Sequence, residues 1–330
     1  MKKNSVSIIV STLIGVLVLL FLYTKINIKE VLAIFKNITW QVLAVYLAAI
    51  ILIEIFLVVR WDVILKEQNR FVPFANLLMY KEAGYAVGYI TPQAHLGGEP
   101  VRALLLKRHH MSFKTALSSI LIDKSLILVT DTFFGSIGVL LLLINLEFDP
   151  LLRILCILIG LIPLLLIFCF YYRLLRGLPF FTSLFRSLRL NKIKFTSKFE
   201  KDLRVIEKDM IDFFKNHKRV FIKIVLIQLI LWSLMYVEYK SALLMLGYNT
   251  PLHRLFLILS SVAISYVMPV PLALGVLEFG QVSTLSLLKL PSQVGLAISL
   301  LIRIKDILRT AIGLIVLSYF GLPWNWKSKH

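Results

Sequence analysis

The chain has 330 residues, of which 58% are hydrophobic, with a mean hydropathy of +0.84 and a formal net charge of +19. This balance excludes an ordinary soluble domain and predicts an all-α polytopic membrane protein. The basic excess is typical of cytoplasmic loops that contact anionic lipid headgroups, so we do not expect nucleic-acid binding.

Six apolar stretches are predicted to cross the membrane, because each holds about 20 mostly apolar residues. They are Val6–Tyr23, Trp40–Val59, Leu117–Leu146, Ile154–Tyr172, Phe221–Leu244 and Gln293–Phe320. Trp40 and Trp61 bracket the second stretch, and Trp324 and Trp326 follow the last. Tryptophans at such positions are typical of the belts that mark the membrane interface.

Two further apolar stretches, Asn76–Leu106 and Leu255–Leu288, are interrupted by the same pattern. The first contains Tyr89-Ile-Thr-Pro92 followed by Gly97-Gly98-Glu99, and the second contains Tyr266-Val-Met-Pro269 followed by Gly275 and Glu278. Proline and glycine break helices, and the membrane interior tolerates broken backbone only where protein or a water-filled cavity covers it. We therefore predict two re-entrant hairpins, each made of two half-helices.

The basic residues set the expected orientation and the division of the chain. Residues 173–219 hold 13 Lys and Arg against 5 Asp and Glu, which predicts a cytoplasmic loop, both termini inside and a plasma-membrane location. The expected units are a first membrane repeat (1–146), an external turn and fourth span (147–172), the basic loop with an amphipathic helix (173–219), the remainder of a second membrane repeat (220–320) and a cytoplasmic tail (321–330). The second repeat runs in the opposite sense to the first, so we predict an inverted repeat of the kind found in transporters.

The basic loop contains a predicted amphipathic helix, Lys198–Asn216. Its apolar residues Leu203, Ile206, Met210 and Phe213 recur at helical spacing. We interpret it as a helix lying on the inner membrane surface, with a partner-docking helix as the alternative.

The first break favours an anion-binding role. Gly97 and Gly98 let the chain turn, and the half-helix Glu99–Lys107 then directs its free amides and positive dipole end toward the bilayer interior. Arg102, in its first turn, has a planar fork that can bind phosphate bidentately. Gly275 precedes the equivalent half-helix in the second break. The alternative is that these glycines only permit close helix packing.

Charged residues within the long apolar stretches are the second set of candidates. The first repeat has Asp123, Lys124 and Asp131, and the second has Arg303, Lys305, Asp306 and Arg309. A charge at the bilayer centre costs about 2.5–3.5 kcal/mol, so these residues pair with one another or line a polar cavity.

Spacing suggests which of these charges correspond between the repeats. Asp123 lies 24 residues after Glu99 and Arg303 lies 25 after Glu278, so we match these two with opposite charge. Arg303 and Asp306, one turn apart, are expected to form a local pair. We assign Arg303 with Arg102 to phosphate contact, and gating or proton coupling to the acidic residues Glu99, Asp123, Asp131, Glu278 and Asp306. The alternative is a set of structural ion pairs.

Several motifs are absent from the sequence. There is no Gly-x4-Gly-Lys-Ser/Thr loop, no His-Glu-x-x-His and no paired Cys-x-x-Cys. We therefore expect no cofactor, no metal and no catalytic residues.

The chain resembles the transmembrane region of lysylphosphatidylglycerol synthases, a flippase-like integral membrane family. The resemblance rests on Gly97-Gly98-Glu99-Pro-Val-Arg102-Ala, Asp123-Lys124 and Asp131 in the first half, and on Pro269-Val-Pro, Gly275, Glu278, Arg303 and Gly313 in the second. In two-part members this region is thought to move aminoacylated phosphatidylglycerol across the membrane, while a separate soluble domain makes that lipid. We expect that soluble domain to be missing from a chain that stops at His330.

The resemblance implies an inner-membrane flippase or scramblase for a lipid with an anionic headgroup, such as aminoacyl-phosphatidylglycerol, another phospholipid or a polyprenyl-linked lipid. A lipid-synthesising enzyme is the expected protein partner. Two alternatives stay open, namely a phosphatidylglycerol lysyltransferase-like enzyme and an accessory membrane subunit.

Overall fold

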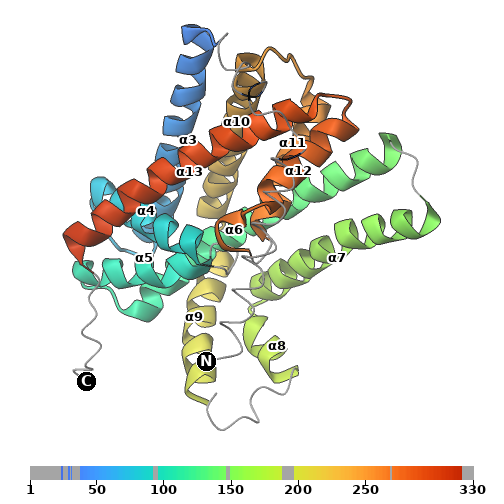
Figure 1. Ribbon diagram of the computed structural model, residues 1–330. Helices are drawn as coiled ribbons and strands as arrows, with labels where there is room; N and C mark the ends of the chain where they lie inside the picture. Colours follow the sequence, from blue (N-terminus) through green and yellow to red (C-terminus); the bar gives the residue numbers. More distant parts are fainter. Residues whose placement is uncertain are drawn as a thin grey trace.

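The computed structural model of the chain describes residues 24, 29, 31, 38–91, 96–145, 149–187, 197–267 and 270–321. Within these residues all regular structure is helical, with no strand (Figure 1). Helices of this length and apolarity make the chain a helical membrane protein. The predicted first span, Val6–Tyr23, and both chain ends lie outside the described residues.

Five long helices form where apolar stretches were predicted. They are α3 (Trp40–Glu67), α6 (Phe113–Asn145), α7 (Pro150–Leu175), α10 (Lys218–Met245) and α13 (Ser292–Phe320). Among the described residues, α3, the Arg153–Leu175 part of α7, and α10 are long and apolar enough to cross a membrane by composition alone. Helices α6 and α13 are as long, but they carry the charged residues singled out above, which must be covered by protein or water.

Both predicted breaks are confirmed as helix–break–helix segments. Helix α4 (Phe74–Ile90) is followed by a 3₁₀ turn at Leu96–Gly98 and then by α5 (Glu99–Leu106). Helix α11 (Leu252–Val267) is followed by a 3₁₀ turn at Pro271–Ala273 and then by α12 (Val276–Leu287). Short 3₁₀ turns, Lys107–His109 in the first case, lead on toward the next long helix. Pro92, His95 and Pro269 lie outside the described residues.

The helices fall into two sets of the same order and similar length, α3–α6 and α10–α13. The second set starts its helices at residues 218, 252, 276 and 292, about 178 residues after the starts at 40, 74, 99 and 113. Helices α3 and α10 lie side by side and run antiparallel, since the end of α3 meets the start of α10 through Glu67 and His217 (Figure 1). Helix α4 packs on α13 and α11 packs on α6, so each set reaches across to the other.

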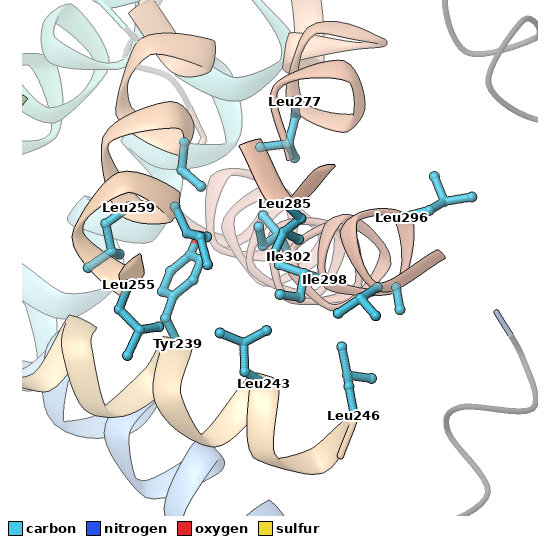
Figure 2. Packing of buried hydrophobic residues seen from close by; sticks show 14 of the residues in the cluster. Tyr239, Leu243, Leu246, Leu255, Leu259, Leu277, Leu285, Leu296, Ile298 and Ile302 are labelled. Atoms are coloured by element: carbon cyan, nitrogen blue, oxygen red, sulfur yellow. The ribbon is translucent and has the colours of Figure 1, made fainter. Parts of the chain in front are cut away.

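A hydrophobic core fixes the second break against α10 and α13. Tyr239 and Leu243 of α10 meet Leu255 of α11, Leu277 of α12 and Ile298 of α13 (Figure 2). Each of these side chains is at most 4% exposed. Burying a side chain of this size contributes about 1.5–3 kcal/mol, so the position of α12 next to α13 is strongly determined.

Helix α9 (Ser197–Asn216) confirms the predicted amphipathic helix but corrects where its apolar face lies. Ile206, Met210, Phe213 and Phe214 are buried in one cluster with side chains of α6, α7 and α10. The interpretation as a helix resting on lipid is therefore wrong for this face, which packs on the bundle instead.

The short helix α8 (Phe181–Ser187) is held to α9 by one buried carboxylate. Glu207 accepts hydrogen bonds from the backbone N–H groups of Phe180, Phe181 and Thr182, at the start of α8. An acidic side chain at this position satisfies free helix amides and complements the helix dipole.

Candidate functional site

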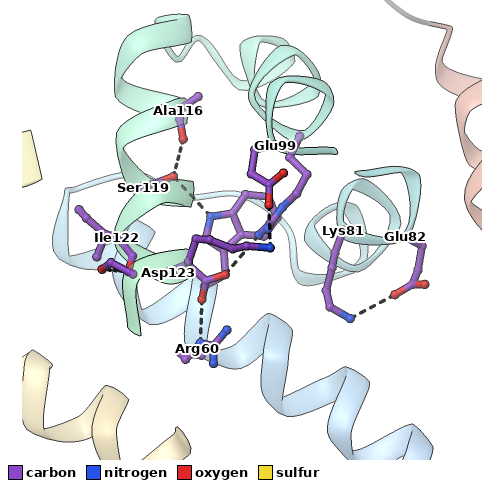
Figure 3. A network of polar contacts seen from close by, with 12 residues as sticks. Arg60, Lys81, Glu82, Glu99, Ala116, Ser119, Ile122 and Asp123 are labelled. Atoms are coloured by element: carbon purple, nitrogen blue, oxygen red, sulfur yellow. Dashed lines mark hydrogen bonds and ion pairs between the residues drawn. The ribbon is translucent and has the colours of Figure 1, made fainter. Parts of the chain in front are cut away.

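A cluster of three cations and two carboxylates lies beside the first break (Figure 3). Its members are Arg60 of α3, Glu99 and Arg102 of α5, and Asp123 and Lys124 of α6. The structure thus brings together the predicted residues Glu99, Arg102 and Asp123, and adds Arg60, which the sequence reasoning missed.

Asp123 holds the two arginines of this cluster. The Nε atom of Arg60 donates to Asp123 Oδ1 at 2.7 Å, and Arg102 Nη2 lies 3.6 Å from Asp123 Oδ2. Arg60 also donates to the side-chain oxygen of Gln228 on α10. Residues Arg60 and Asp123 are 1% and 3% exposed, so their charges depend on each other rather than on solvent.

Trp61 forms the floor under Arg102. The guanidinium carbon of Arg102 lies 4.0 Å from the Trp61 ring centroid, and the indole N–H donates to Ser119 Oγ at 3.4 Å. The Trp61 side chain is completely buried. Its predicted place in an interfacial belt is therefore wrong, and it instead supports Arg102 by a cation–π contact.

Three buried polar atoms of this cluster have no hydrogen-bond partner in the described part of the chain. They are Arg60 Nη2, Arg102 Nε and Glu99 Oε2. The other Glu99 oxygen, Oε1, is 3.1 Å from Lys124 Nζ. Buried polar groups almost always find a partner, so such atoms mark a place where a partner binds. Two free cationic donors suit the oxygens of a phosphate group, and the free carboxylate oxygen suits a hydroxyl or amine.

The glycines of the first break bring backbone segments into close contact. A Cβ atom on Gly98 would lie 2.0 Å from the carbonyl oxygen of Gly84 on α4, and one on Gly97 would lie 2.1 Å from Thr91 Oγ1. Close packing therefore explains both glycines, and any role in binding a headgroup stays a prediction. This contact sets α5, and with it Arg102, against α4.

The second break is organised around Arg303 of α13. Its Nε and Nη2 atoms donate to the two carboxylate oxygens of Glu278 at 2.7 and 3.1 Å. The remaining N–H groups donate to Tyr89 Oη at 2.8 Å, to the carbonyl of Ala273 at 3.0 Å and to the carbonyl of Leu272. All five guanidinium donors are thus used by protein acceptors, so phosphate contact by Arg303 requires an exchange of partners.

The two breaks share one register. Each break glutamate pairs with a cation 25 residues later in the following long helix, Glu99 with Lys124 and Glu278 with Arg303. The matching of Asp123 with Arg303 is therefore wrong, because Lys124 occupies the equivalent place and carries the same sign of charge. The backbone agrees, since His110 and Lys289, each eleven residues after its glutamate, both have left-handed φ values of 57° and 59°.

A polar ladder joins α4 to α13. Arg309 donates to both oxygens of Glu82 at 3.0 and 3.2 Å. One turn along, Tyr85 Oη donates to Asp306 Oδ1 at 2.7 Å, and the Tyr89–Arg303 bond forms the third rung. The expected local pair of Arg303 with Asp306 is therefore wrong, because each of them bonds a tyrosine of α4.

The ladder continues into α3 through a buried group of charges. Glu54 of α3 accepts from Lys81 and lies 2.9 Å from Arg309 Nη1. Lys81 also contacts Glu82 at 3.2 Å. Two cations and two carboxylates thus balance, as expected for structural pairs inside a membrane bundle.

The remaining predicted residues contribute less to the described site. Gly275 precedes α12 with a φ of 72°, a backbone conformation that favours glycine. The side chain of Asp131, on α6, lies outside what the structure describes. Among the described residues no group of three or more His, Cys, Asp and Glu side chains could hold a metal ion.

The residues that sequence reasoning missed carry a recognisable signal. Glu82, Tyr85 and Tyr89 recur at helical spacing on α4, and Arg303, Asp306 and Arg309 recur on α13. Two polar stripes at a matching spacing predict two helices packed along them.

Comparison with known proteins gives one match. Residues 8–313 match the family model described as the lysylphosphatidylglycerol synthase TM region. The matched residues include both breaks, the first cluster and the polar ladder. No curated protein and no solved structure matches the chain.

Proposed function

We propose a lipid-translocating function for this chain, which belongs to the family of the lysylphosphatidylglycerol synthase transmembrane region. Membership gives the chain a membrane, lipid-related role. The more specific function that the geometry supports is that of a flippase or scramblase, which passes the headgroup of a phosphate-bearing lipid through the polar interior of the bundle.

One observation carries this proposal. The first-break cluster has three cations against two carboxylates, and two of its cations keep a buried donor without a partner, Arg60 Nη2 and Arg102 Nε. A purely structural cluster would satisfy its donors, because an unmade buried hydrogen bond costs about 1–3 kcal/mol. A lipid phosphate supplies the missing negative charge and the missing acceptors. The free Oε2 of Glu99 is placed to bind a hydroxyl or amine of the same headgroup.

The arrangement of the helices supports a transporter architecture. We infer that α3–α6 and α10–α13 are inverted repeats, since their helices share order, length and an offset of about 178 residues, and since α3 and α10 run antiparallel. Transporters of this kind bind substrate between the repeats, near discontinuous helices. The two breaks are then re-entrant, and both termini face the cytoplasm of the plasma membrane. Cysteine labelling at Lys289 tests this, because access from the cytoplasmic side contradicts a second hairpin entered from outside.

Within this proposal the predicted residues have different tasks. Arg102, with Arg60, binds the phosphate in the state described by the structure. Arg303 reaches a phosphate only if it releases Glu278, so this pair acts in gating. Glu99, Asp123, Asp131 and Asp306 keep their predicted roles in gating or proton coupling, and Gly97, Gly98 and Gly275 shape the backbone around the headgroup.

The test is translocation by the purified protein in liposomes. Fluorescent phosphatidylglycerol and a polyprenyl phosphate serve as probes, and the rate of exchange between leaflets is compared with that of empty vesicles. We expect faster exchange with the wild-type chain and at least a tenfold loss in Arg102→Gln, which removes a charged donor worth about 1.5–3 kcal/mol.

Lys114→Gln is the matched control. Lys114 is also a cation near the start of α6, but its side chain is 43% exposed and pairs with Asp202 of α9. It should leave the exchange rate unchanged. Rates equal to those of empty vesicles for every lipid tried would contradict the proposed function.

A further inference from the structure

We propose that the headgroup moves along α6 from the first-break cluster and that the seam between α6 and α11 opens to let it pass, while the seam between α4 and α13 stays closed. This inference rests on the proposed function and adds the route of the lipid to it. The two seams occupy equivalent positions in the two sets of helices, because α4 and α11 correspond to each other, as do α13 and α6.

The α4–α13 seam is the stronger of the two. Its three rungs are the Glu82–Arg309 pair, the Tyr85–Asp306 bond and the Tyr89–Arg303 bond. The helices also touch closely, since a Cβ atom on Gly313 would lie 2.2 Å from the carbonyl oxygen of Glu82. Separating these helices would leave several buried charges without partners at once, and each such charge costs several kcal/mol.

The α6–α11 seam has no comparable bonds. After Arg254, in its first turn, α11 contains no charged residue up to its end at Val267. The contact is made by small residues, because a Cβ atom on Gly138 would lie 2.3 Å from Ser260 Oγ. The Ser260 hydroxyl bonds within its own helix, to the carbonyl of Phe256 at 2.8 Å. Opening this seam therefore breaks packing but no ion pair.

The seam lies on the path away from the unpartnered donors. Lys124 and Gly138 are both on α6, and the 14 residues between them correspond to about 21 Å along the helix axis. That is about two thirds of the hydrocarbon thickness of about 30 Å. A headgroup that starts at Arg60, Arg102 and Lys124 and follows α6 to Gly138 thus covers most of the crossing.

A disulfide across the seam tests this route. The variant carries Gly138→Cys and Ser260→Cys in a chain with Cys156→Ser and Cys169→Ser. Its Cβ atoms start about 2.9 Å apart, so a shift of about 1 Å reaches disulfide geometry. We expect translocation in liposomes to fall at least tenfold on oxidation and to return on reduction. Equal rates in both states would overturn the proposed route.

A neighbouring disulfide provides the matched control. Val139→Cys with Gly160→Cys ties α6 to α7, and a Cβ on Gly160 lies 3.8 Å from that of Val139, which suits a disulfide. The proposal expects equal translocation by the oxidised and reduced forms of this pair. A loss as large as that of the seam pair would show that any cross-link on α6 stops the protein, and would overturn the assignment to α11.

Distance measurements separate the failure of this inference from failure of the proposed function. Spin labels at exposed Leu140 of α6 and His253 of α11 report the seam, and labels at exposed Ile90 of α4 and Ile304 of α13 report the ladder. In vesicles of phosphatidylglycerol we expect two distances at the seam and one at the ladder. One distance at the seam overturns the inference even if lipid moves, and two distances support it even if the probe lipids do not.

Discussion

The two breaks of this chain have the same register but different electrostatic completeness. At the second break, Arg303 places all five of its donors on protein acceptors, including both oxygens of Glu278. At the first, Glu99 meets Lys124 through one oxygen only, and buried donors of Arg60 and Arg102 have no partner among the described residues. A shared backbone plan thus supports a closed ion pair in one half and an open anion site in the other.

This difference separates residues that hold the fold from residues that bind. A buried pair with every donor used resists removal, because the partner left behind keeps its charge in a dry place. A cluster with unused donors is less stable than it could be, and that cost is understandable if a ligand completes it. The asymmetry assigns binding to the first break and scaffolding to the second.

The largest expected effect comes from Arg303→Ala. It leaves Glu278 buried and unpaired, so the free energy of unfolding should fall by about 3–5 kcal/mol. Lys124→Ala removes a single bond at a side chain that is 22% exposed and should cost about 1 kcal/mol. Apparent melting temperatures in detergent measure both. Adding Glu278→Gln to Arg303→Ala should recover part of the loss, and equal losses at the two positions would remove the proposed contrast.

The break glutamates give a second, smaller comparison. Glu278→Gln places an amide N–H₂ against the Arg303 fork and should cost about 1.5–3 kcal/mol, the range for charged hydrogen bonds. Glu99→Gln changes a carboxylate with one oxygen already unpartnered, so its cost should stay below about 1 kcal/mol. The same thermal measurement decides, with lipid-free protein for both variants. A more damaging Glu99→Gln would mean that the first break is the scaffold.

Much of the fold was predictable from the sequence, because apolar length and helix breakers are local signals. Stretches such as Trp40–Val59 predicted their helices, and proline and glycine predicted the breaks. The spacing of Glu99 and Glu278 from later charges indicated a repeat. It did not distinguish Asp123 from Lys124, because a one-residue difference in spacing is resolved only by the actual contact.

The partners of the charged residues were not predictable from local pattern. Arg60 and Trp61 follow an apolar run and suggest a membrane interface, yet the packing of α5 and α6 over α3 buries both. Asp306 lies one turn from Arg303, but α4 supplies Tyr85 as a better-placed donor. Which helix covers a polar stripe is decided by tertiary packing, so a single sequence shows that a charge needs a partner without naming it.

The glycines of the two breaks should respond for different physical reasons. Gly98→Ala places a methyl group 2.0 Å from the carbonyl oxygen of Gly84, so the backbone must shift, at about 1–3 kcal/mol. That shift moves α5, and binding of a phosphate lipid through Arg102 should weaken severalfold. Gly275→Ala strains a φ of 72° and should cost about 1–2 kcal/mol without changing lipid binding at the first break.

Lipid affinity and melting temperature, measured on the same preparations, separate the two effects. Gly135→Ala on α6 is the control, because its Cβ meets nothing within 4 Å and alanine favours a helix. It should leave both quantities unchanged or slightly raise the melting temperature. Unchanged lipid affinity in Gly98→Ala would show that the position of α5 does not control the site.

The smallest expected effect is a pH dependence at the foot of the first hairpin. His109 Nε2 lies 3.1 Å from Tyr80 Oη and 3.3 Å from Asn76 Nδ2. Burial lowers the pKa of His109 below its ordinary value of 6.5, and the neighbouring His110 and Arg108 lower it further. The unfolded chain therefore takes up this proton first as the pH falls. The contribution to stability is complete above pH 6.5 and is lost as the pH falls below it.

The melting temperature should accordingly be lower at pH 5.5 than at pH 7.5, by less than in any of the three comparisons above, because His109 is only partly buried. His109→Gln should reduce this difference, whereas His110→Gln, at the exposed neighbour, should reduce it less. The second hairpin has Lys289 at the position equivalent to His110 and no histidine at its foot, so it adds nothing of this kind. An unchanged pH difference in His109→Gln would place the titrating group elsewhere, and would remove this last distinction between the two hairpins.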